Sequence, residues 1–302
     1  EGPVPPHAAL NLPPDLYSRL LLQLGEPETA ALAAALKQPA PTDVRVNSLK
    51  ATREEVRAAL QAQGVAATPT PYAALGLRLA QRLSKQSTLL LDGEIEPQDE
   101  GSQLLAELAA AAPGETVIDW CAGVGGKSLA MAAAMQDQGR LIACDISASR
   151  LAKLPPRAAR AGIGCIETRP HAEGSLRGIA ADLVLVDAPC SGTGTLRRSP
   201  ELRLRQFDYA ALAALQLQIL GEAAATVRVG GRLIYATCSL LVEENEQVTA
   251  RFLQAHANFQ PHRPATLPDA LDALVDAQGR LRLWPQRQGS DGFFAQVFLR
   301  KS

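Results

Sequence analysis

The pattern of apolar and polar positions divides the chain near residue 96. From Asp99 onward, short apolar runs alternate with longer segments whose apolar residues recur every three or four positions. Runs of the first kind predict buried strands, and segments of the second kind predict amphipathic helices. Strands that alternate with helices favour a parallel sheet with right-handed crossovers. We therefore predict a doubly wound α/β domain over residues 96–302, with its ligands at the carboxyl ends of the strands.

The elements expected in this domain follow one another regularly. Strands are predicted at 116–121, 140–145, near 165, 183–186 and 232–237. Helices are predicted at 101–112, 127–136, 147–161, 200–227 and 242–255. Two late strands, at 281–284 and 293–299, are expected to pair as an antiparallel edge.

Residues 1–95 have a different pattern. About the first forty residues predict helices, which proline-rich stretches open at Pro13-Pro14 and close at Pro39-Ala40-Pro41. Residues 43–47 alternate like a strand, and residues 52–63 predict a helix that begins with a capping box. This part of the chain is therefore predicted to be a smaller α+β domain.

Composition narrows the class of protein. The 302 residues carry 30 Lys+Arg and 31 Asp+Glu, for a net charge of -1, which argues against binding to nucleic acid by bulk positive charge. The aromatic content of 4% argues against a broad base-stacking platform. No apolar run approaches the roughly 20 residues that span a bilayer. We expect a soluble, cytoplasmic and monomeric protein.

The five cysteines show neither C-x-x-C pairs nor histidines at zinc-site spacing. Neither a disulfide framework nor a metal site is expected. Cys144 and Cys165 are interpreted as small buried residues.

The first candidate site is a glycine-rich turn between a predicted strand and a predicted helix. It runs Cys121-Ala122-Gly123-Val124-Gly125-Gly126-Lys127-Ser128. A dinucleotide motif fails because Ser128 stands where the third glycine should be, and a P-loop lacks its leading glycine, which falls on Cys121. A third interpretation is a loop for S-adenosylmethionine. All three use glycines for close backbone approach and a helix N-terminus for its free N–H groups.

Asp145 ends the next strand, 145 − 119 = 26 residues beyond Asp119. An acidic residue there accepts hydrogen bonds from ribose hydroxyls, which suits NAD or S-adenosylmethionine but not a P-loop. A helix cap is an equally good interpretation of Asp145 alone.

Two further clusters follow predicted strands and bring cysteines to the same sheet edge. One is Asp187-Ala188-Pro189-Cys190-Ser191-Gly192, and the other is Thr237-Cys238-Ser239. Lys127 and a helix N-terminus nearby could stabilise a thiolate there. The apolar strand that ends at Asp187 also resembles the metal-binding strand of an ATPase, which gives the P-loop alternative a second partial match, but that alternative leaves the Cys238 cluster unexplained.

These motifs together resemble one family, the RNA (cytosine-5) methyltransferases of the Nol/Nop/Sun type, which include bacterial Sun-like rRNA methyltransferases. The similarity spans most of the chain. It is also carried by Arg45-Val46-Asn47-Ser48-Leu49-Lys50, Gln98-Asp99-Glu100-Gly101-Ser102-Gln103 and Arg197-Arg198-Ser199-Pro200-Glu201.

The resemblance implies a Rossmann-like, S-adenosylmethionine-dependent methyltransferase domain behind the smaller N-terminal α+β domain. It makes Cys238 the nucleophile, Cys190 the cysteine that assists product release, and Asp187 the contact to the cytosine ring, with Lys127 in the same catalytic group. The cofactor-binding set that it implies is Cys121, Ala122, Gly123, Val124, Gly125, Gly126, Lys127, Asp145 and Asp187.

The sequence departs from the family pattern twice. Gly123-Val124 replaces the usual Ala-Pro of the glycine turn, and the acidic residue that should hold the adenine amino group after the third strand is missing. Either Glu167, in a shifted register, or a backbone carbonyl is expected to take that role.

The implied reaction is methylation of cytosine C5 in RNA, with ribosomal RNA favoured over transfer RNA. C5 is a weak nucleophile, so a thiolate must first add to C6, and the base must leave its stack to be reached. Four arginines beside the active-site loop are predicted to contact RNA: Arg197, Arg198, Arg203 and Arg205. The alternatives are a P-loop nucleotide-binding protein and a non-catalytic RNA-binding module with a methyltransferase fold.

Overall fold

A mixed sheet of eight strands forms the centre of the computed structural model, which describes residues 4–171, 176 and 178–301. Its order is β10-β12-β9-β8-β5-β6-β7, with β11 paired to β12. The parallel strands are β5 (Thr116–Asp119), β6 (Arg140–Asp145), β7 (Ile166–Pro170), β8 (Ala181–Asp187) and β9 (Val227–Thr237). The antiparallel edge consists of β10 (Phe259–Pro261), β11 (Arg280–Leu283) and β12 (Phe293–Arg300). The predicted doubly wound α/β fold and its antiparallel edge are confirmed.

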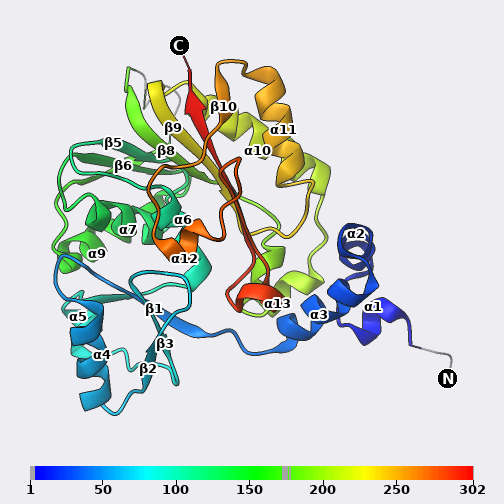
Figure 1. Cartoon of the computed structure of the whole chain (residues 1–302), viewed down its shortest axis with the longest axis horizontal. Helices are drawn as coiled ribbons and strands as arrows, with labels where there is room; N and C mark the ends of the chain where they lie inside the picture. The colour runs from blue at the N-terminus through cyan, green and yellow to red at the C-terminus, as the bar shows by residue number, and fades with distance from the viewer. Residues whose placement is uncertain (1–3, 172–175, 177, 302) are drawn as a thin grey trace.

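Helices cover both faces of this sheet (Figure 1). One face packs against α6 (Glu100–Leu108), α7 (Gly126–Ala134) and α9 (Leu154–Ala161). The other packs against α10 (Tyr209–Ala224) and α11 (Glu246–Ala255). Neighbouring strand residues alternate between the two faces: Leu183 and Leu185 join the first core, whereas Val184 and Val186 join the second. Burial on both faces explains the uninterrupted apolar run of β8.

Two predicted helices are broken in the structure. The helix expected at 147–161 is divided into α8 (Ala148–Leu151) and α9, because the prolines at 155 and 156 can stand only in the first turn of a new helix. The helix expected at 200–227 is a 3₁₀ segment, Pro200–Leu204, followed by α10. Asp208 caps α10 by accepting the N–H of Ala211, so the helix begins there.

A second, four-stranded antiparallel sheet has the order β2-β3-β1-β4. Its strands are β1 (Thr42–Val46), β2 (Ala67–Pro69), β3 (Gly76–Leu79) and β4 (Ile95–Pro97). It packs against α4 (Arg53–Ala62), which begins with the predicted capping box between Thr52 and Glu55, and the short α5 (Thr88–Leu91) completes this unit. Strand β4 crosses the domain boundary predicted at residue 95.

The N-terminal helices lie apart from this small sheet (Figure 1). They are α1 (Pro6–Ala9), α2 (Pro14–Leu24) and α3 (Glu26–Lys37). Their leucines share a core with Leu196, Tyr209 and Trp284 of the large domain. Trp284 directly precedes α13 (Pro285–Gln288). The short α12 (Asp269–Asp272) lies in the connection before β11. In space, the first forty residues therefore belong with the α/β domain.

The small sheet is fixed against the large domain by hydrogen bonds to backbone carbonyls. Asn47 donates to the carbonyls of Gly93 and Ala161, both at 2.9 Å. Lys50 donates to the carbonyls of Asp92 and Arg160, at 2.6 and 2.7 Å. Arg160 and Ala161 end α9 of the large domain, so these hydrogen bonds join the small sheet to that helix. Within the described ranges, no helix is both long enough and apolar enough to cross a membrane.

Candidate active site

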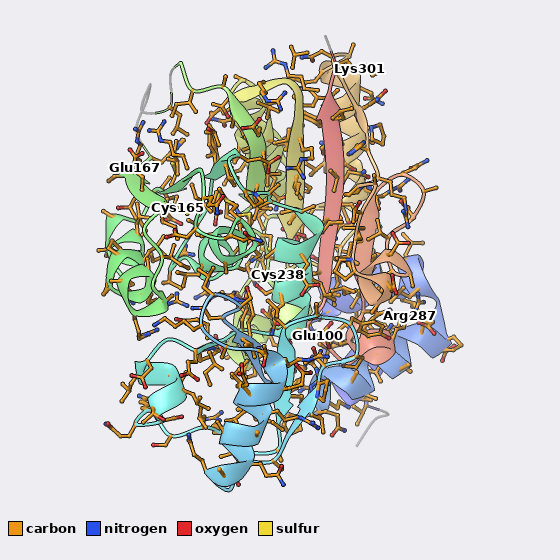
Figure 2. All side chains as sticks on the ribbon, turned by 60° about the vertical axis from the view of Figure 1, so that its left-hand side comes forward. Glu100, Cys165, Glu167, Cys238, Arg287 and Lys301 are labelled. Carbon is orange, nitrogen blue, oxygen red and sulfur yellow. The ribbon has the colours of Figure 1, made fainter. Side chains whose placement is uncertain are left out.

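The polar clusters predicted from the sequence meet at one edge of the large sheet. Asp119, Asp145 and Asp187 end β5, β6 and β8, and Thr237 ends β9. Because parallel neighbours run in register, with Asp187 opposite Ala236, the residues that follow them are neighbours in space. Figure 2 shows Cys238 at this edge, between the large sheet and the small domain.

The two candidate cysteines face each other across this edge. The Sγ atoms of Cys190 and Cys238 lie 3.4 Å apart, and both side chains are partly buried. The loops that carry them are joined by a backbone hydrogen bond of 2.9 Å from the N–H of Gly194 to the carbonyl of Cys238. The predicted juxtaposition of the cysteines is therefore present in the structure.

An ion pair stands beside the thiols. The Nζ of Lys127 donates to the Oδ2 of Asp187 at 2.6 Å. Burial by itself lowers the pKa of Lys127, but the charges of Asp187, Asp119 and Cys238 raise it overall. Lys127 therefore remains a cation next to the cysteines, where positive charge favours a thiolate.

The surroundings of Cys190 weaken the acidity of its thiol. The hydrogen bond to Cys238 is the largest of several effects that raise the pKa of Cys190 well above its usual value, followed by burial and by the charges of Cys238 and Glu244. Cys190 therefore keeps its proton at neutral pH.

Asp145 organises the glycine turn. Its Oδ2 accepts the N–H of Gly123 at 2.8 Å, and its Oδ1 accepts the N–H of Ser147 at 2.7 Å. Gly123 has a φ of 59°, and an added Cβ there would come within 2.3 Å of the Arg150 guanidinium. A left-handed φ favours glycine at this position, and Asp145 is both a capping residue and a carboxylate whose oxygens have acceptor capacity left for a ligand.

The charges around the turn suit a ligand that carries positive charge. Asp119 is buried, its Oδ2 accepts the Ser128 hydroxyl at 2.7 Å, and its Oδ1 has no hydrogen-bond partner. Burial raises the pKa of Asp119 to about 7. The first turn of α7 offers N–H groups without intrahelical partners to an anionic group. S-adenosylmethionine, with its sulfonium, ammonium and carboxylate groups, fits this combination, whereas a polyphosphate would face three carboxylates.

The thiols of the other three cysteines are weak acids. Burial raises the pKa of Cys144 and of Cys165 to about 12, and burial together with the nearby aspartates raises the pKa of Cys121 further. Among the described residues, no group of three or more His, Cys, Asp or Glu side chains is placed to hold a metal ion.

Glu167 does not reach the carboxyl edge, so the shifted-register hypothesis for the adenine contact is wrong. It pairs with Ile142, three residues before Asp145, which is about 10 Å along the strand. Its carboxylate instead pairs with Arg140 and Arg169. A backbone carbonyl remains the prediction for the adenine contact.

The arginines predicted to contact RNA are mostly used within the chain. Arg197 is nearly buried and pairs with Asp291 at 2.9 Å, and Arg198 pairs with Asp291 and Asp99. Arg203 donates to three backbone carbonyls, those of Asn11, Leu196 and Leu36. These three arginines fix the loop after Cys190. The side chain of Arg197 is only 5% exposed, which corrects its interpretation as an RNA ligand, whereas RNA contact by Arg198 and Arg203 stays a prediction. Arg205 is exposed and keeps its predicted role.

Two of the stretches that carry the family resemblance have roles that the sequence did not indicate. Arg45 donates to the carbonyl of Gly126 at 2.9 Å, so the small sheet supports the first residue of α7. Glu100 accepts the N–H groups of Tyr72 and Ala73, at 2.6 and 3.1 Å. Only the folded structure shows that these side chains hold the two domains together, because their hydrogen-bond partners lie in the other domain.

A family model described as "16S rRNA methyltransferase RsmB/F" matches residues 106–299, and a model of its ferredoxin-like domain matches residues 12–86. The probable ribosomal RNA small subunit methyltransferase B of Bacillus subtilis is 34% identical over 85% of this chain and 59% of its own length. The corresponding Synechocystis protein is 35% identical over 93% of this chain and 65% of its own. The chain thus spans about three fifths of these relatives.

Solved structures match the whole fold. A methyltransferase homolog from Pyrococcus horikoshii has a TM-score of 0.82 at 25% identity, covering 99% of this chain and 100% of its own. NSun6 from the same organism, solved with SFG, an analogue of S-adenosylmethionine, has a TM-score of 0.85 at 20% identity, covering 96% and 98%. The resemblance and the fold class predicted from the sequence are confirmed.

Proposed function

Since the chain belongs to the family of the 16S rRNA methyltransferases RsmB/F, we propose that it methylates C5 of a cytosine in ribosomal RNA through a covalent bond between Cys238 and C6 of the base. The observation that carries this proposal is the pair of thiols 3.4 Å apart, beside the ion pair of Lys127 and Asp187. A methyltransferase that acts on a more nucleophilic atom needs neither cysteine.

The cofactor proposed is S-adenosylmethionine, which supplies an electrophilic methyl group on sulfur. The residues that would hold it are the glycine turn from Cys121 to Lys127, Asp119 and Asp145. Asp145 would accept the ribose hydroxyls, and the free Oδ1 of Asp119 would accept from the ammonium group. The N-terminus of α7 would face the carboxylate.

The chain's own residues then carry the chemistry on the base. The thiolate of Cys238 adds to C6, and the π electrons move toward C5 and N3. Lys127 and Asp187, already hydrogen-bonded, present a donor beside the ring that compensates the charge arising at N3. C5 thereby becomes nucleophilic enough to accept the methyl group.

Release of the methylated cytosine from Cys238 needs a group that accepts a proton. After methylation, C5 carries both the methyl group and its original hydrogen, and that hydrogen must leave as a proton before the bond between Cys238 and C6 can break. Once Cys238 is bonded to C6, its hydrogen bond and its charge no longer raise the pKa of Cys190, so Cys190 can lose its thiol proton to water. We assign the transfer of the C5 proton to the resulting thiolate, directly or through water. The electron pair of the C–H bond restores the double bond, and Cys238 leaves as thiolate.

Incubation with methyl-labelled S-adenosylmethionine tests the proposal. The chain is given 16S rRNA or, in a separate reaction, transfer RNA, and modified cytosines are mapped by bisulfite sequencing. A protected cytosine is expected in 16S rRNA. Label on another base, or label in neither RNA, contradicts the proposal, and protection only in transfer RNA changes the substrate. Binding of magnesium ATP instead of S-adenosylmethionine would favour the P-loop alternative.

A prediction about the cofactor follows from Asp145. The substitution Asp145→Ala should weaken S-adenosylmethionine binding by about 1.5–3 kcal/mol, the value of a hydrogen bond to a charged group, or roughly 10- to 150-fold in Kd. Isothermal titration calorimetry measures the change. Asp137→Ala is the matched control, because Asp137 accepts the N–H groups of Gly164 and Cys165 in a turn at the opposite edge of the sheet. Equal affinity of Asp145→Ala and wild type would leave Asp145 only its capping role.

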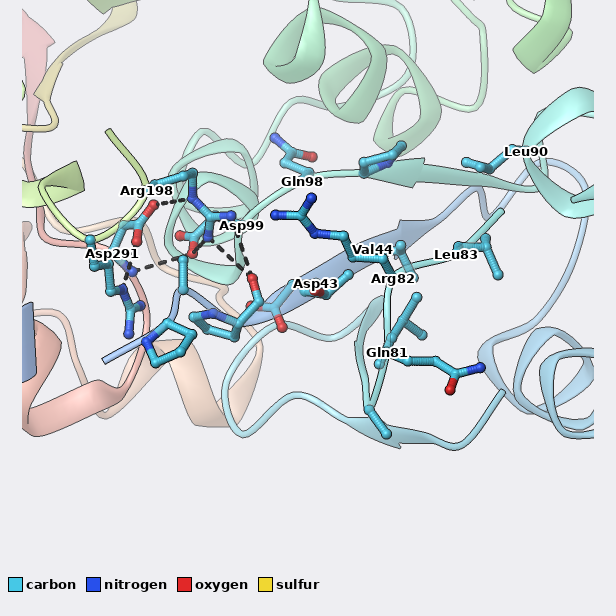
Figure 3. A pocket seen from close by; sticks show the side chains of 18 of the residues that line it. Asp43, Val44, Gln81, Arg82, Leu83, Leu90, Gln98, Asp99, Arg198 and Asp291 are labelled. Atoms are coloured by element: carbon cyan, nitrogen blue, oxygen red, sulfur yellow. Dashed lines mark hydrogen bonds and ion pairs between the residues drawn. The ribbon is translucent and has the colours of Figure 1, made fainter. Parts of the chain in front are cut away.

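A groove of about 1060 Å³ between the two domains offers a path for RNA. Figure 3 shows Arg198 joined to Asp99 and Asp291 on one side, while Arg82 lies on the other. Arg82 and Lys85 line the groove, are exposed, and form no ion pair within the part of the chain that the structure describes. Unpaired cations of this kind are available to phosphates.

We expect the double variant Arg82→Glu/Lys85→Glu to raise the KM for RNA about tenfold or more at moderate salt, with unchanged cofactor affinity. Steady-state kinetics at several salt concentrations give this value, and the salt dependence of binding should become shallower. Arg197→Ala provides the contrast, since loss of its buried ion pair should lower the melting temperature rather than selectively raise KM. A KM equal to that of wild type would exclude these side chains from the RNA path.

A further inference from the structure

Glu244 lies behind the two cysteines, on the loop between β9 and α11. Its side chain is 0% exposed. In the ranges that the structure describes, it forms no ion pair, whereas its neighbour Glu243 pairs with Arg19 at the surface. A carboxylate buried without a cation is costly unless hydrogen bonds satisfy it.

Four donors satisfy this carboxylate. Its Oε1 accepts the N–H of Ser191 at 2.9 Å and the amide of Gln216 at 3.0 Å. Its Oε2 accepts the hydroxyls of Ser191, at 2.5 Å, and Ser239. Gln216 also donates to the carbonyl of Pro189, so a further bond holds the same loop.

The position of these donors in the chain is informative. Ser191 directly follows Cys190, and Ser239 directly follows Cys238. One carboxylate therefore binds the residue next to each candidate cysteine. An ionised carboxylate has acceptor sites only, so it can take donors from both loops at once.

We propose that Glu244 is a positioning residue that holds the loops of Cys190 and Cys238 in the register that brings their sulfurs together. The inference rests on the proposed function, which gives the two cysteines successive tasks on one base. A shift of about 1 Å in such a pair is enough to cost roughly 100-fold in rate.

The charge of Glu244 has a second consequence. The ionisable groups that face Cys190 are Cys238, Glu244 and Tyr235, with Lys127 near Cys238. The hydrogen bond to Cys238, burial, the charge of Cys238 and then the charge of Glu244 all raise the pKa of Cys190. Removing the negative charge should therefore lower that pKa, so that Cys190 becomes a thiolate at lower pH.

Two substitutions separate the effect of the hydrogen-bonded link between the two loops from the effect of the negative charge of Glu244. Glu244→Gln preserves the shape: its oxygen can accept from Ser191 and Gln216, and its amide can donate to the serine hydroxyls, which can turn to accept. Glu244→Ala removes the link. Glu243→Gln is the matched control on the same loop.

The first measurement needs neither RNA nor cofactor. Each protein is alkylated with iodoacetamide over a range of pH, and mass spectrometry follows Cys190 and Cys238 separately. In Glu244→Gln the midpoint for Cys190 should move to lower pH, and in Glu243→Gln it should stay at the wild-type value. An unchanged midpoint in Glu244→Gln would refute the electrostatic part of the inference, even if Glu244→Ala fails to fold.

The second measurement follows adduct formation on RNA that contains 5-fluorocytidine, in which fluorine blocks loss of the C5 substituent. Glu244→Ala should form adduct about 100-fold more slowly than wild type, while Glu244→Gln should stay within about tenfold. Wild-type rates in a folded Glu244→Ala would overturn the positioning role. If Glu244→Ala does not fold, an adduct rate for Glu244→Gln that is much more than tenfold below the wild-type rate would overturn the positioning role, because this variant keeps the hydrogen bonds to both loops. Absence of adduct in wild type would instead contradict the proposed function, and the alkylation result would still decide the inference.

Discussion

Replacement of Cys238 by alanine is expected to abolish methyl transfer, with a loss of roughly 10⁴-fold or more, because the nucleophile is removed. The variant should also form no adduct with RNA that contains 5-fluorocytidine. Denaturing electrophoresis detects the adduct, and release of label from S-adenosylmethionine measures transfer. Binding of S-adenosylmethionine should be unchanged.

The control for this prediction is Cys165→Ala, which removes a thiol far from the carboxyl edge, and it should retain activity and adduct formation. An adduct in Cys238→Ala would mean that Cys190, only 3.4 Å away, attacks instead. The roles would then follow DNA cytosine-5 methyltransferases, whose attacking thiol lies in a Pro-Cys motif like Pro189-Cys190 here. Full activity without any adduct would exclude covalent catalysis.

The second large effect is expected for Cys190→Ala. This variant keeps the thiolate of Cys238 and the ion pair of Lys127 and Asp187, so addition and methyl transfer should proceed. Without the group that takes the C5 proton, the enzyme should stall as a protein–RNA adduct on ordinary RNA. A single turnover should occur at a rate close to that of wild type, while multiple turnover falls by roughly 100-fold or more, since a general base is lost.

The measurement is a comparison of burst and steady-state phases, with the adduct followed on denaturing gels. Wild type should show little adduct on ordinary RNA because release follows transfer. Cys190→Ala that turns over at the wild-type rate would show that another group, or water alone, removes the proton. Loss of the burst itself would show that Cys190 is needed for a step that comes before methyl transfer or for the transfer itself.

Sequence patterns predicted the order of the helices and strands well, because that order depends on which positions are buried. The apolar run that ends at Asp187 needed burial on both faces, and β8 has it. The meeting of Cys190 and Cys238 was predictable for a related reason: both follow neighbouring parallel strands, and the ends of such strands share an edge. The family resemblance rested on these same positions.

Side-chain partners could not be predicted in this way. Arg197 resembled an RNA ligand in the sequence, but its partner Asp291 is 94 positions away, and only folding brings the two together. The same holds for Glu244, whose donors come from α10 and from the loops after β8 and β9. Hydrophobic periodicity indicates whether a residue is buried, but it does not indicate which charge a buried residue meets.

The sequence by itself determined the α/β architecture, the edge that holds the chemistry and the residue types present there, because periodicity and strand ends are local properties. Only the tertiary structure decided that the N-terminal helices pack on the large domain, that Glu167 stays below the edge and that three of the four arginines are held within the chain. Each of these outcomes depends on contacts between segments far apart in the chain, where geometry and desolvation select the partner.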